Sequence, residues 1–370
     1  MKLLHICCNL AGSSVFPQLF EALHGEGLEQ EVFVPEKRAS SVGKHVVDGV
    51  PTHYALTVRR SDAVFFFRKA QRSVPAVMKA VDMSGVTLVH AHTLFTDGSI
   101  ARALSRRTGV PYTVTLRYSD EVIWRWEPHL RPLACRILRD AQRVVFLSAT
   151  VRDKVIAGWA AEDERGALAA KAEVIPNGIR RQWLDGTPRD ALHDPVRVGF
   201  AGLLNGRKRP MDALAAVHAA DDALRGGRRY VMTACGSGPL EEQFRAALRE
   251  GDSFAGRVQG MEAMKRFYAD CDVLLVPSSA ETFGMVYLEA MSQGVPVLYT
   301  RGQGFDGQFP EGEAGFSVAC GDIEEQAARI EDVCADYAAR SARCIALSGE
   351  YAWPIVAQKW MKLYAGAAKE

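Results

Sequence analysis

Short apolar segments alternate with longer amphipathic segments along the whole chain. In the first half, the strand-like runs are LLHICC (3–8), EVFVP (31–35), TLVHAH (87–92), YTVTLR (112–117), RVVFLS (143–148) and EVIP (173–176). Helix-like patterns lie between them, for example at 15–25, at 62–82 with a kink expected at Pro75, at 97–108 and at 129–141. Because continuous apolar strands that alternate with helices form parallel sheets covered on both faces, the pattern predicts an α/β fold.

The second half repeats this rhythm. Its strand-like runs lie at 196–202, 228–236, 252–258, 272–278 and 296–300. Between the halves, WLDGTPRDALHDP (183–195) is rich in Asp, Pro and Gly and has weak periodicity, which predicts a linker. A length of 370 residues also favours two domains. We therefore expect two doubly wound, Rossmann-like domains that face each other across a central cleft, with ligands bound beyond the carboxyl ends of the strands.

Charge is distributed unevenly between the halves. The net charge of +1 argues against a nucleic-acid binder, but it combines +7 over residues 1–182 with −6 over residues 183–370. The first half is therefore the place to look for an anionic partner or a membrane surface. Within it, segment 59–79 mixes six basic residues with three consecutive phenylalanines. We favour a core-facing helix with solvated basic side chains; the alternative is a patch that rests on an anionic bilayer.

The cysteines and the N-terminus bear on the compartment. None of the eight cysteines forms a C-x-x-C pair, so we expect free thiols in a reducing cytoplasm rather than disulfides or a zinc site. The start, MKLLHICCNL, is too short and too quickly polar for a secretion signal, and no apolar run reaches membrane length. The sequence predicts a cytoplasmic protein.

The stretch SAETFGMVYLEAMSQGVPVLY (279–299) places two carboxylates in an apolar setting. Glu281 falls in the loop after strand 272–278, and Glu289 falls in the helix that follows. The start of that helix, near 283–286, has unpaired N–H groups that attract an anion. Carboxylates there would repel a phosphate unless they bound something else, and sugar hydroxyls are suitable donors. The segment therefore favours a sugar attached to a phosphate; the alternative is that Glu281 stabilises the helix start and Glu289 is solvated.

Several motifs in order resemble one family. E-T-F-G-M-V-Y-L-E resembles the E-x7-E motif of the family 4 retaining glycosyltransferases of GT-B fold. The resemblance extends to VIPNGI (174–179), GFAGLLNGRKRPMDALAAV (199–217), CGSGP (235–239), FAGRV (254–258) and YAWPIVAQKWMKLY (351–364). The last looks like the C-terminal helix that crosses back to the first domain. The resemblance thus implies an acceptor-binding domain of residues 1–182 plus 350–370, the linker 183–195, and a nucleotide-sugar-binding domain of residues 196–349.

The resemblance assigns the donor site to the second domain. Glu281 matches the residue that holds the donor sugar's hydroxyls, Glu289 the one that binds the ribose, and Lys208 the lysine on the diphosphate. The family usually has an Arg directly after Gly202, but this chain has Leu203, so Arg207 or Arg209 is expected to supply the second cation; Arg207 is counted with Glu281 and Lys208 as catalytic. The implied donor-binding residues are Gly12, Gly202, Gly236, Arg257, Val258, Thr282, Phe283, Gly284, Met285, Val286 and Glu289.

The acceptor side departs further from the family. Where a His-Gly pair is common, this chain reads TLRYSD, so Arg117 and Asp120 are candidate acceptor-binding residues, together with His92 at the end of the preceding strand. Arg117 would hold a phosphate of the acceptor or of the donor; the alternative is a structural ion pair with Asp120. Histidines such as His90 and His92 are more often structural than catalytic, and nothing in the sequence indicates a metal site.

In function, the resemblance implies metal-independent transfer of a hexose or N-acetylhexosamine with retention of configuration, from a UDP- or GDP-linked sugar and without a further cofactor. The acceptor would be a hydroxyl of a glycan or lipid-linked molecule, in surface polysaccharide or glycolipid assembly at the inner face of the membrane, with peripheral membrane contact through the basic first domain. The alternatives are a sugar-nucleotide epimerase or phosphorylase of the same architecture, and a catalytically silent sugar-nucleotide-binding subunit, which Leu203 and Arg117 keep open.

Overall fold

The computed structural model describes residues 1–63 and 66–368 of the chain. The chain divides into two compact units, Met1–Gly178 with Trp353–Glu370, and Ile179–Ala352. These divisions fall within a few residues of the expected domain limits. Segment 183–195, expected as a linker, packs on the second unit, where Arg189 donates hydrogen bonds to the carbonyls of Tyr268 and Cys271.

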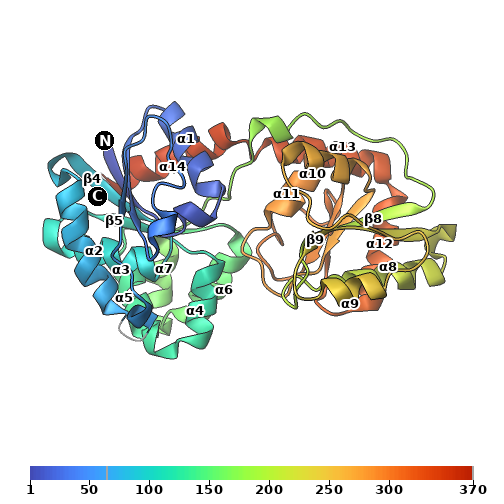
Figure 1. Cartoon of the computed structure of the whole chain (residues 1–370), viewed down its shortest axis with the longest axis horizontal. Helices are drawn as coiled ribbons and strands as arrows, with labels where there is room; N and C mark the ends of the chain where they lie inside the picture. The colour runs from blue at the N-terminus through green and yellow to red at the C-terminus, as the bar shows by residue number, and fades with distance from the viewer. Residues whose placement is uncertain (64–65, 369–370) are drawn as a thin grey trace. The chain divides into compact units, whose positions relative to one another are not determined.

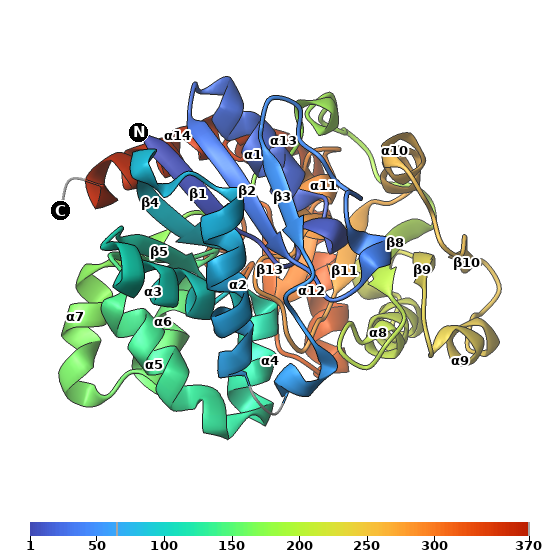
Figure 2. The same ribbon diagram turned by 60° about the vertical axis from the view of Figure 1, so that its left-hand side comes forward.

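The first unit contains a seven-stranded parallel sheet of order β3-β2-β1-β4-β5-β6-β7 (Figure 2). Its strands are β1 (Lys2–Ile6), β2 (Glu29–Pro35), β3 (Thr52–Ala55), β4 (Val86–Ala91), β5 (Tyr112–Thr115), β6 (Arg143–Phe146) and β7 (Ala172–Val174). Its helices are α1 (Val15–Gly25), α2 (Phe67–Ala80), α3 (Thr96–Thr108), α4 (Tyr118–Trp126), α5 (Arg131–Asp140), α6 (Ala149–Trp159), α7 (Arg165–Ala170) and α14 (Trp353–Ala367).

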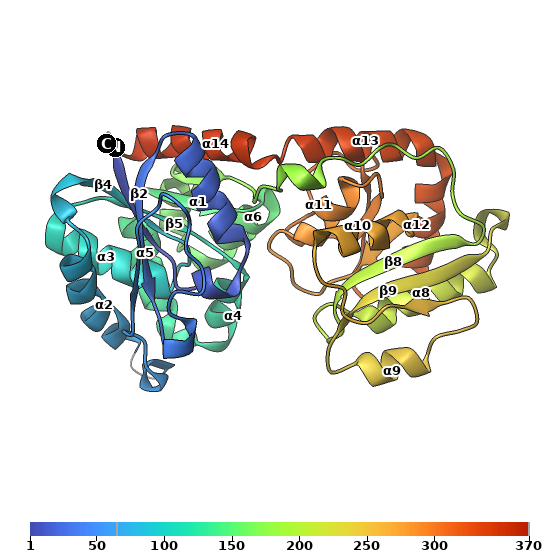
Figure 3. The same ribbon diagram turned by 45° about the horizontal axis from the view of Figure 1, so that its top comes forward.

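Apolar side chains cover both faces of this sheet. One core cluster packs α2, α3 and α5 against it, and the other packs α1 and α14. Helix α14 lies beside α1 although the two are far apart in sequence (Figures 1 and 3), and Trp353 Nε1 donates to Gln18 Oε1 at 2.8 Å. The C-terminal helix therefore completes the first unit, as predicted.

The second unit contains a six-stranded parallel sheet of order β10-β9-β8-β11-β12-β13. Its strands are β8 (Val196–Leu203), β9 (Tyr230–Ser237), β10 (Ser253–Phe254), β11 (Val273–Val276), β12 (Val297–Thr300) and β13 (Gly315–Val318). Its helices are α8 (Pro210–Asp222), α9 (Glu241–Ala246), α10 (Met261–Ala269), α11 (Met285–Met291), α12 (Ile323–Ala335) and α13 (Tyr337–Gly349). The two parallel sheets, one in each unit, confirm the predicted α/β fold with two Rossmann-like domains.

The structure departs from the predicted elements where side-chain patterning is weak. The edge strands β3 and β13 and the helix α4 were not predicted, and β10 spans two residues rather than 252–258. The helix predicted over 62–82 is continuous as α2 through Pro75, but residues 60–63 form a separate 3-10 turn. In segment 59–79, Phe66 is buried and Phe67 is exposed, whereas Phe65 lies outside the described residues. All eight cysteines are free, as predicted.

Candidate functional site

Loops at one edge of the second sheet carry most of the predicted donor-side residues. Strands β10, β9, β8 and β11 are neighbours and run parallel, so the loops that follow them meet at the same edge. Lys208 follows β8, Gly236 lies at the end of β9, Arg257 and Val258 follow β10, and Glu281 follows β11. The topology therefore gathers at one edge residues that are widely separated in the sequence.

An ion pair at this edge joins Lys208 to Glu281. Lys208 Nζ lies 2.6 Å from Glu281 Oε2, and the lysine is only 9% exposed. Its backbone N–H donates to Asn205 Oδ1 at 3.0 Å, and its aliphatic stem passes over Gly202. The lysine is thus held in place by its own loop, and its charge is neutralised by the carboxylate across the edge.

The two candidate arginines of this loop are arranged differently. Arg207 Nη1 donates to the carbonyl of Ala280 at 3.0 Å and lies 3.9 Å from Glu281 Oε2. Arg209 instead pairs with Asp212, three residues along, at 2.5 Å. Leu203, at the position where the family usually has Arg, is 53% exposed. Of the two arginines, Arg207 is therefore the one that lies beside Glu281.

Contacts from another loop hold the backbone of Glu281 in position. The N–H of Glu281 donates to Gln303 Oε1 at 3.0 Å, and the carbonyl of Glu281 accepts from the N–H of Gly304 at 2.7 Å. A Cβ at Gly304 would lie 2.1 Å from the carbonyl carbon of Thr282. Gln303 and Gly304 were not predicted, because they follow β12 and lie outside the motifs that resemble the family. Their position in a loop directly after a strand was the one feature of the sequence that pointed to them.

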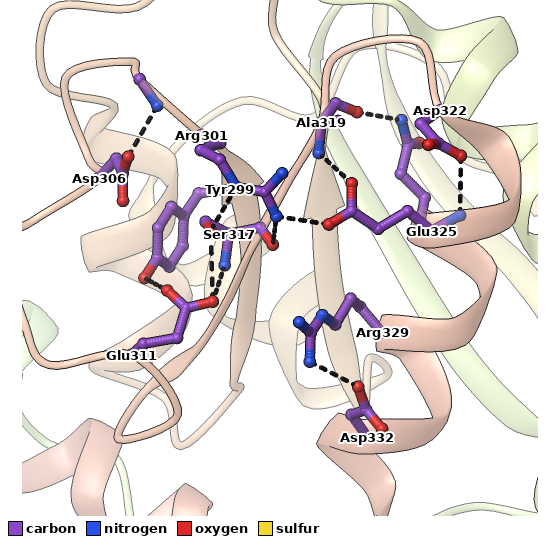
Figure 4. A network of polar contacts seen from close by, with 12 residues as sticks. Tyr299, Arg301, Asp306, Glu311, Ser317, Ala319, Asp322, Glu325, Arg329 and Asp332 are labelled. Atoms are coloured by element: carbon purple, nitrogen blue, oxygen red, sulfur yellow. Dashed lines mark hydrogen bonds and ion pairs between the residues drawn. The ribbon is translucent and has the colours of Figure 1, made fainter.

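A polar network fixes the loop that carries Gln303 and Gly304 (Figure 4). On one side Asp306 Oδ2 accepts from the N–H of Gly302 at 2.7 Å. On the other side Glu311 Oε1 accepts from the N–H of Ser317 at 2.9 Å, and Arg301 pairs with Glu325 of α12. These contacts join the loop to β13 and α12, so the position of Glu281 is tied to the packed body of the unit.

Glu289 lies within α11 in an enclosed setting. Its Oε2 accepts a hydrogen bond from the hydroxyl of Tyr268 at 3.1 Å. Burial raises its pKa from the usual 4.5 to about 7. Near neutral pH this carboxyl group is therefore balanced between its acid and its carboxylate form.

The other predicted donor-side residues fall into three groups. Gly236 is required by close packing, since a Cβ there would lie 1.8 Å from the carbonyl oxygen of Gly202. Arg257 is exposed and Val258 partly buried. Around the start of α11, the side chains of Thr282 and Phe283 are buried, Gly284 adopts φ +87°, and Met285 and Val286 are partly exposed. Phe283 packs on Phe305 and Tyr351, so its side chain is part of the core of the unit.

In the first unit, Arg117 and Asp120 form the start of α4. Asp120 is buried and accepts from the N–H groups of Arg117 at 2.9 Å and Phe95 at 3.3 Å. The guanidinium of Arg117 points elsewhere, donating from Nε to the carbonyl of His92 at 3.2 Å. The carboxylate therefore caps backbone groups, and the described contacts include no ion pair between it and the guanidinium. Gly12 lies after β1, and a Cβ there would meet nothing within 4 Å.

His92 belongs to a buried cluster with His5 and His90. One ring nitrogen from each histidine lies within 4.8 Å of the other two, a spacing that could hold a metal ion. The hydrogen bonds of these rings indicate which ring nitrogens carry a proton. Because Gln30 donates its amide to the carbonyl of Phe20, its Oε1 accepts from His5 Nε2 at 3.0 Å. His5 Nδ1 then accepts from His92 Nε2 at 3.0 Å, which leaves His92 Nδ1 buried without a partner. Burial lowers the pKa of all three rings, to about 3 for His5, so the cluster is a neutral hydrogen-bonded network.

Each of the two units matches a family of known proteins. Residues 12–178 match the glycosyl transferase 4-like domain, and residues 189–346 match glycosyl transferases group 1. The chain is 30% identical over 311 residues to D-inositol 3-phosphate glycosyltransferase of Geodermatophilus obscurus. The aligned segment covers 79% of this chain and 64% of that protein. Across the curated relatives, the matched segments span from 20% to 69% of the relative's own length.

Solved structures share the fold. Sucrose-phosphate synthase from Thermosynechococcus elongatus matches with a TM-score of 0.77 and 18% identity, over 99% of this chain and 98% of that one. Anabaena HepE in complex with UDP-glucose matches with a TM-score of 0.70 and 18% identity, over 99% of this chain and 100% of that one. The chain belongs to the GT-B glycosyltransferases of the family 4 type, and the expectation of a glycosyltransferase is confirmed at this level.

Within residues 1–63 and 66–368, no helix combines the length and the apolar character that crossing a membrane requires.

Proposed function

We propose that this chain is a retaining hexosyltransferase or N-acetylhexosaminyltransferase that uses a UDP- or GDP-linked sugar and requires neither metal nor a further cofactor. The sugar is transferred to a hydroxyl of a glycan or lipid-linked acceptor, in surface polysaccharide or glycolipid assembly. The enzyme works in the cytoplasm at the inner face of the membrane, which the basic first unit contacts peripherally. The complex of Anabaena HepE with UDP-glucose supports a nucleotide-sugar donor by analogy of fold.

One observation carries the proposal: the contact of Lys208 with Glu281 at one sheet edge, with Arg207 beside them. When the bond from the sugar to the phosphate breaks, negative charge grows on the departing diphosphate, and fixed cations stabilise it. Lys208 and Arg207 supply two such charges without a metal ion. Glu281, released from the lysine when the diphosphate binds, is then available to accept sugar hydroxyls. The departing phosphate deprotonates the acceptor hydroxyl on the face that it leaves, which retains the configuration.

The donor site is tested by ligand-dependent stability. UDP-, GDP- and ADP-sugars are added without metal, and the midpoint of thermal unfolding is measured for the wild type, Glu281→Gln and the exposed-site control Glu250→Gln. A ligand that binds only the native state raises the midpoint by mass action. We expect one sugar nucleotide to stabilise the wild type and Glu250→Gln, and to lose roughly tenfold or more in affinity in Glu281→Gln, since hydrogen bonds to a charged group are removed.

Product analysis completes the test. The anomeric configuration of the glycoside, read by NMR, and activity in EDTA check retention and metal independence. If no sugar nucleotide raises the midpoint, or if Glu250→Gln is affected as strongly as Glu281→Gln, the proposed donor site is wrong. Conversion of the donor to its epimer without transfer would replace the transferase with an epimerase.

A second prediction concerns pH. Glu289 matches the ribose-binding glutamate, and hydroxyl groups donate to its carboxylate form. With a pKa of about 7 in the empty site, lowering the pH from 8 to 6 protonates the group. The dissociation constant of the UDP- or GDP-sugar should then rise by about tenfold, because the fraction of Glu289 in the carboxylate form falls by about tenfold between pH 8 and pH 6. The same raised pKa makes the contribution of Glu289 to stability fall as pH rises from 4.5 through 7, because the folded state binds the extra proton.

Isothermal titration of the sugar nucleotide at several pH values measures this effect. Glu289→Gln, which carries no titrating carboxyl group, is expected to bind more weakly at pH 8 and to show a flat profile. A wild-type profile as flat as that of Glu289→Gln would contradict the ribose assignment.

A further inference from the structure

Arg117 is a partly buried cation without a carboxylate partner among the described contacts. Its Nε donates to the carbonyl of His92 at 3.2 Å, its Nη1 donates to Asn177 Oδ1 at 3.4 Å, and its guanidinium carbon lies 4.5 Å from the centre of the Phe16 ring. These partners are neutral. They fix the guanidinium at the carboxyl end of β5 but leave its charge without a contacting anion, which is costly for a group shielded from water.

Lys69 of α2 is a second cation of this kind. Its Nζ lies 3.8 Å from the centre of the Phe66 ring and 3.3 Å from Thr96 Oγ1, both neutral partners. Burial lowers its pKa. Arg72, one turn further along the same helix, is instead paired with Asp62. Asp62, which lies before the helix, thus neutralises Arg72, whereas the contacts described for Lys69 include no carboxylate.

The two cations lie on opposite ends of one turn. This turn, residues 92–95, joins β4 to α3; Arg117 contacts its first residue, His92, and Lys69 contacts Thr96, the first residue of α3. The loop after β1 reaches the same place, because the N–H of Cys8 donates to Asp97 Oδ1 at 3.0 Å. Carboxyl ends of the neighbouring strands β1, β4 and β5 therefore meet around Arg117 and Lys69.

The acidic groups nearby compensate this charge incompletely. Burial raises the pKa of Asp97 to about 7 and that of Asp120 to about 6. Asp120 is committed to backbone N–H groups of α4 and the preceding turn. Asp97 Oδ2 has no partner, and this carboxyl group is partly protonated near neutral pH. Positive charge thus remains at this edge for an external anion.

We propose that Arg117 and Lys69 bind a phosphate group carried by the acceptor, so that the acceptor is a hydroxyl compound bearing a phosphate ester. This inference rests on the proposed function, because it names the chemistry of the molecule that receives the sugar. A planar guanidinium engages two phosphate oxygens at once, and a separate ammonium binds another as a point charge. The phosphate belongs either to a soluble polyol or sugar phosphate or to a lipid headgroup, which share this chemistry.

Binding is measured without any sugar nucleotide, so that failure of the donor site does not affect the result. Inorganic phosphate and glycerol 3-phosphate are titrated into the wild type, Arg117→Gln and Lys69→Gln, with glycerol as the neutral probe. The matched controls are Lys79→Gln, an exposed lysine of α2, and Arg125→Gln of α4. We expect the phosphate compounds to bind the wild type and both controls, and each site substitution to weaken binding by about 10- to 100-fold.

Three outcomes overturn the proposal: no phosphate binding by the wild type, equal binding by the site variants and the controls, or binding of glycerol as strong as that of glycerol 3-phosphate. A fourth is a loss of UDP or GDP binding in Arg117→Gln with phosphate binding intact, which would assign Arg117 to the donor. Vesicles with and without phosphatidylinositol separate the two sources: sedimentation with the vesicles, lost in Arg117→Gln, identifies a lipid headgroup.

A measurement on the unaltered protein covers the case in which a variant fails to fold. Acetylation of individual lysines is followed by mass spectrometry with and without inorganic phosphate. Phosphate should slow the acetylation of Lys69 severalfold and leave that of Lys79 unchanged. Equal rates at Lys69 with and without phosphate would rule out the subsite.

Discussion

Replacing Lys208 by Met is expected to lower kcat/KM for sugar transfer by about 100- to 1000-fold, the effect of removing one fixed donor from developing negative charge. Methionine keeps the aliphatic stem over Gly202 and removes only the ammonium group. Because Lys208 Nζ is the closest cation to Glu281, at 2.6 Å against 3.9 Å for Arg207, the substitution also leaves that carboxylate less compensated. Most of the loss should appear in kcat, since the charge on the diphosphate grows as the bond breaks.

Steady-state kinetics on the identified donor check this expectation against two arginine variants. Arg207→Gln should lower kcat/KM by roughly tenfold, because the substitution removes one hydrogen bond to a charged group. Arg209→Gln should change it little, because Arg209 is turned toward Asp212. If Lys208→Met retains the wild-type kcat, or if Arg209→Gln is the more damaging arginine variant, the phosphate site is misplaced.

The fold could be predicted largely because parallel sheets have a strong signature. Strands buried on both faces are continuous apolar runs, as in DVLLVPS, and most strands are followed by a helix. The elements that escaped prediction lie where this signature fades. The edge strand β3 is partly exposed along its whole length. Helix α4 (Tyr118–Trp126), which is capped by Arg117, mixes charged and aromatic residues and has no clear apolar stripe.

The site divides in the same way. The sequence places Lys208 and Glu281 in loops after strands, and parallel topology brings the ends of those strands to one sheet edge, where the two side chains meet. Glu289 lies in the helix that follows Glu281, and the donor-binding roles of all three residues stay predictions. The sequence left open which arginine accompanies Lys208, because adjacent loop residues point in directions set by tertiary contacts: Arg209 by Asp212, and Arg207 by the carbonyl of Ala280. Whether Arg117 pairs with Asp120 was also undecidable, since that depends on whether the carboxylate caps backbone groups.

Gly304→Ala is expected to lower kcat/KM by about 100-fold with the fold intact, because a displacement of the reacting groups by about 1 Å has an effect of that size. A Cβ at this position would lie 2.1 Å from the carbonyl carbon of Thr282 and 2.7 Å from the carbonyl oxygen of Glu281. Both are backbone atoms, which cannot rotate out of the way as a side chain can. The clash must therefore move the loop of Glu281 or that of Gly304, and it strains their hydrogen bond of 2.7 Å.

Kinetics, donor affinity and thermal unfolding separate this positioning effect from a general loss of structure. Gly349→Ala, at the end of α13 with nothing within 4 Å of the added Cβ, is the matched control and should behave as the wild type. Gln303→Leu, which removes the acceptor from the N–H of Glu281, should lower kcat/KM by roughly tenfold. Because the polar network around Arg301 and Glu311 anchors this loop independently, the unfolding midpoint of Gly304→Ala should fall by only a few degrees. A Gly304→Ala enzyme with the wild-type kcat/KM would show that the loop tolerates movement and that Gly304 does not position Glu281.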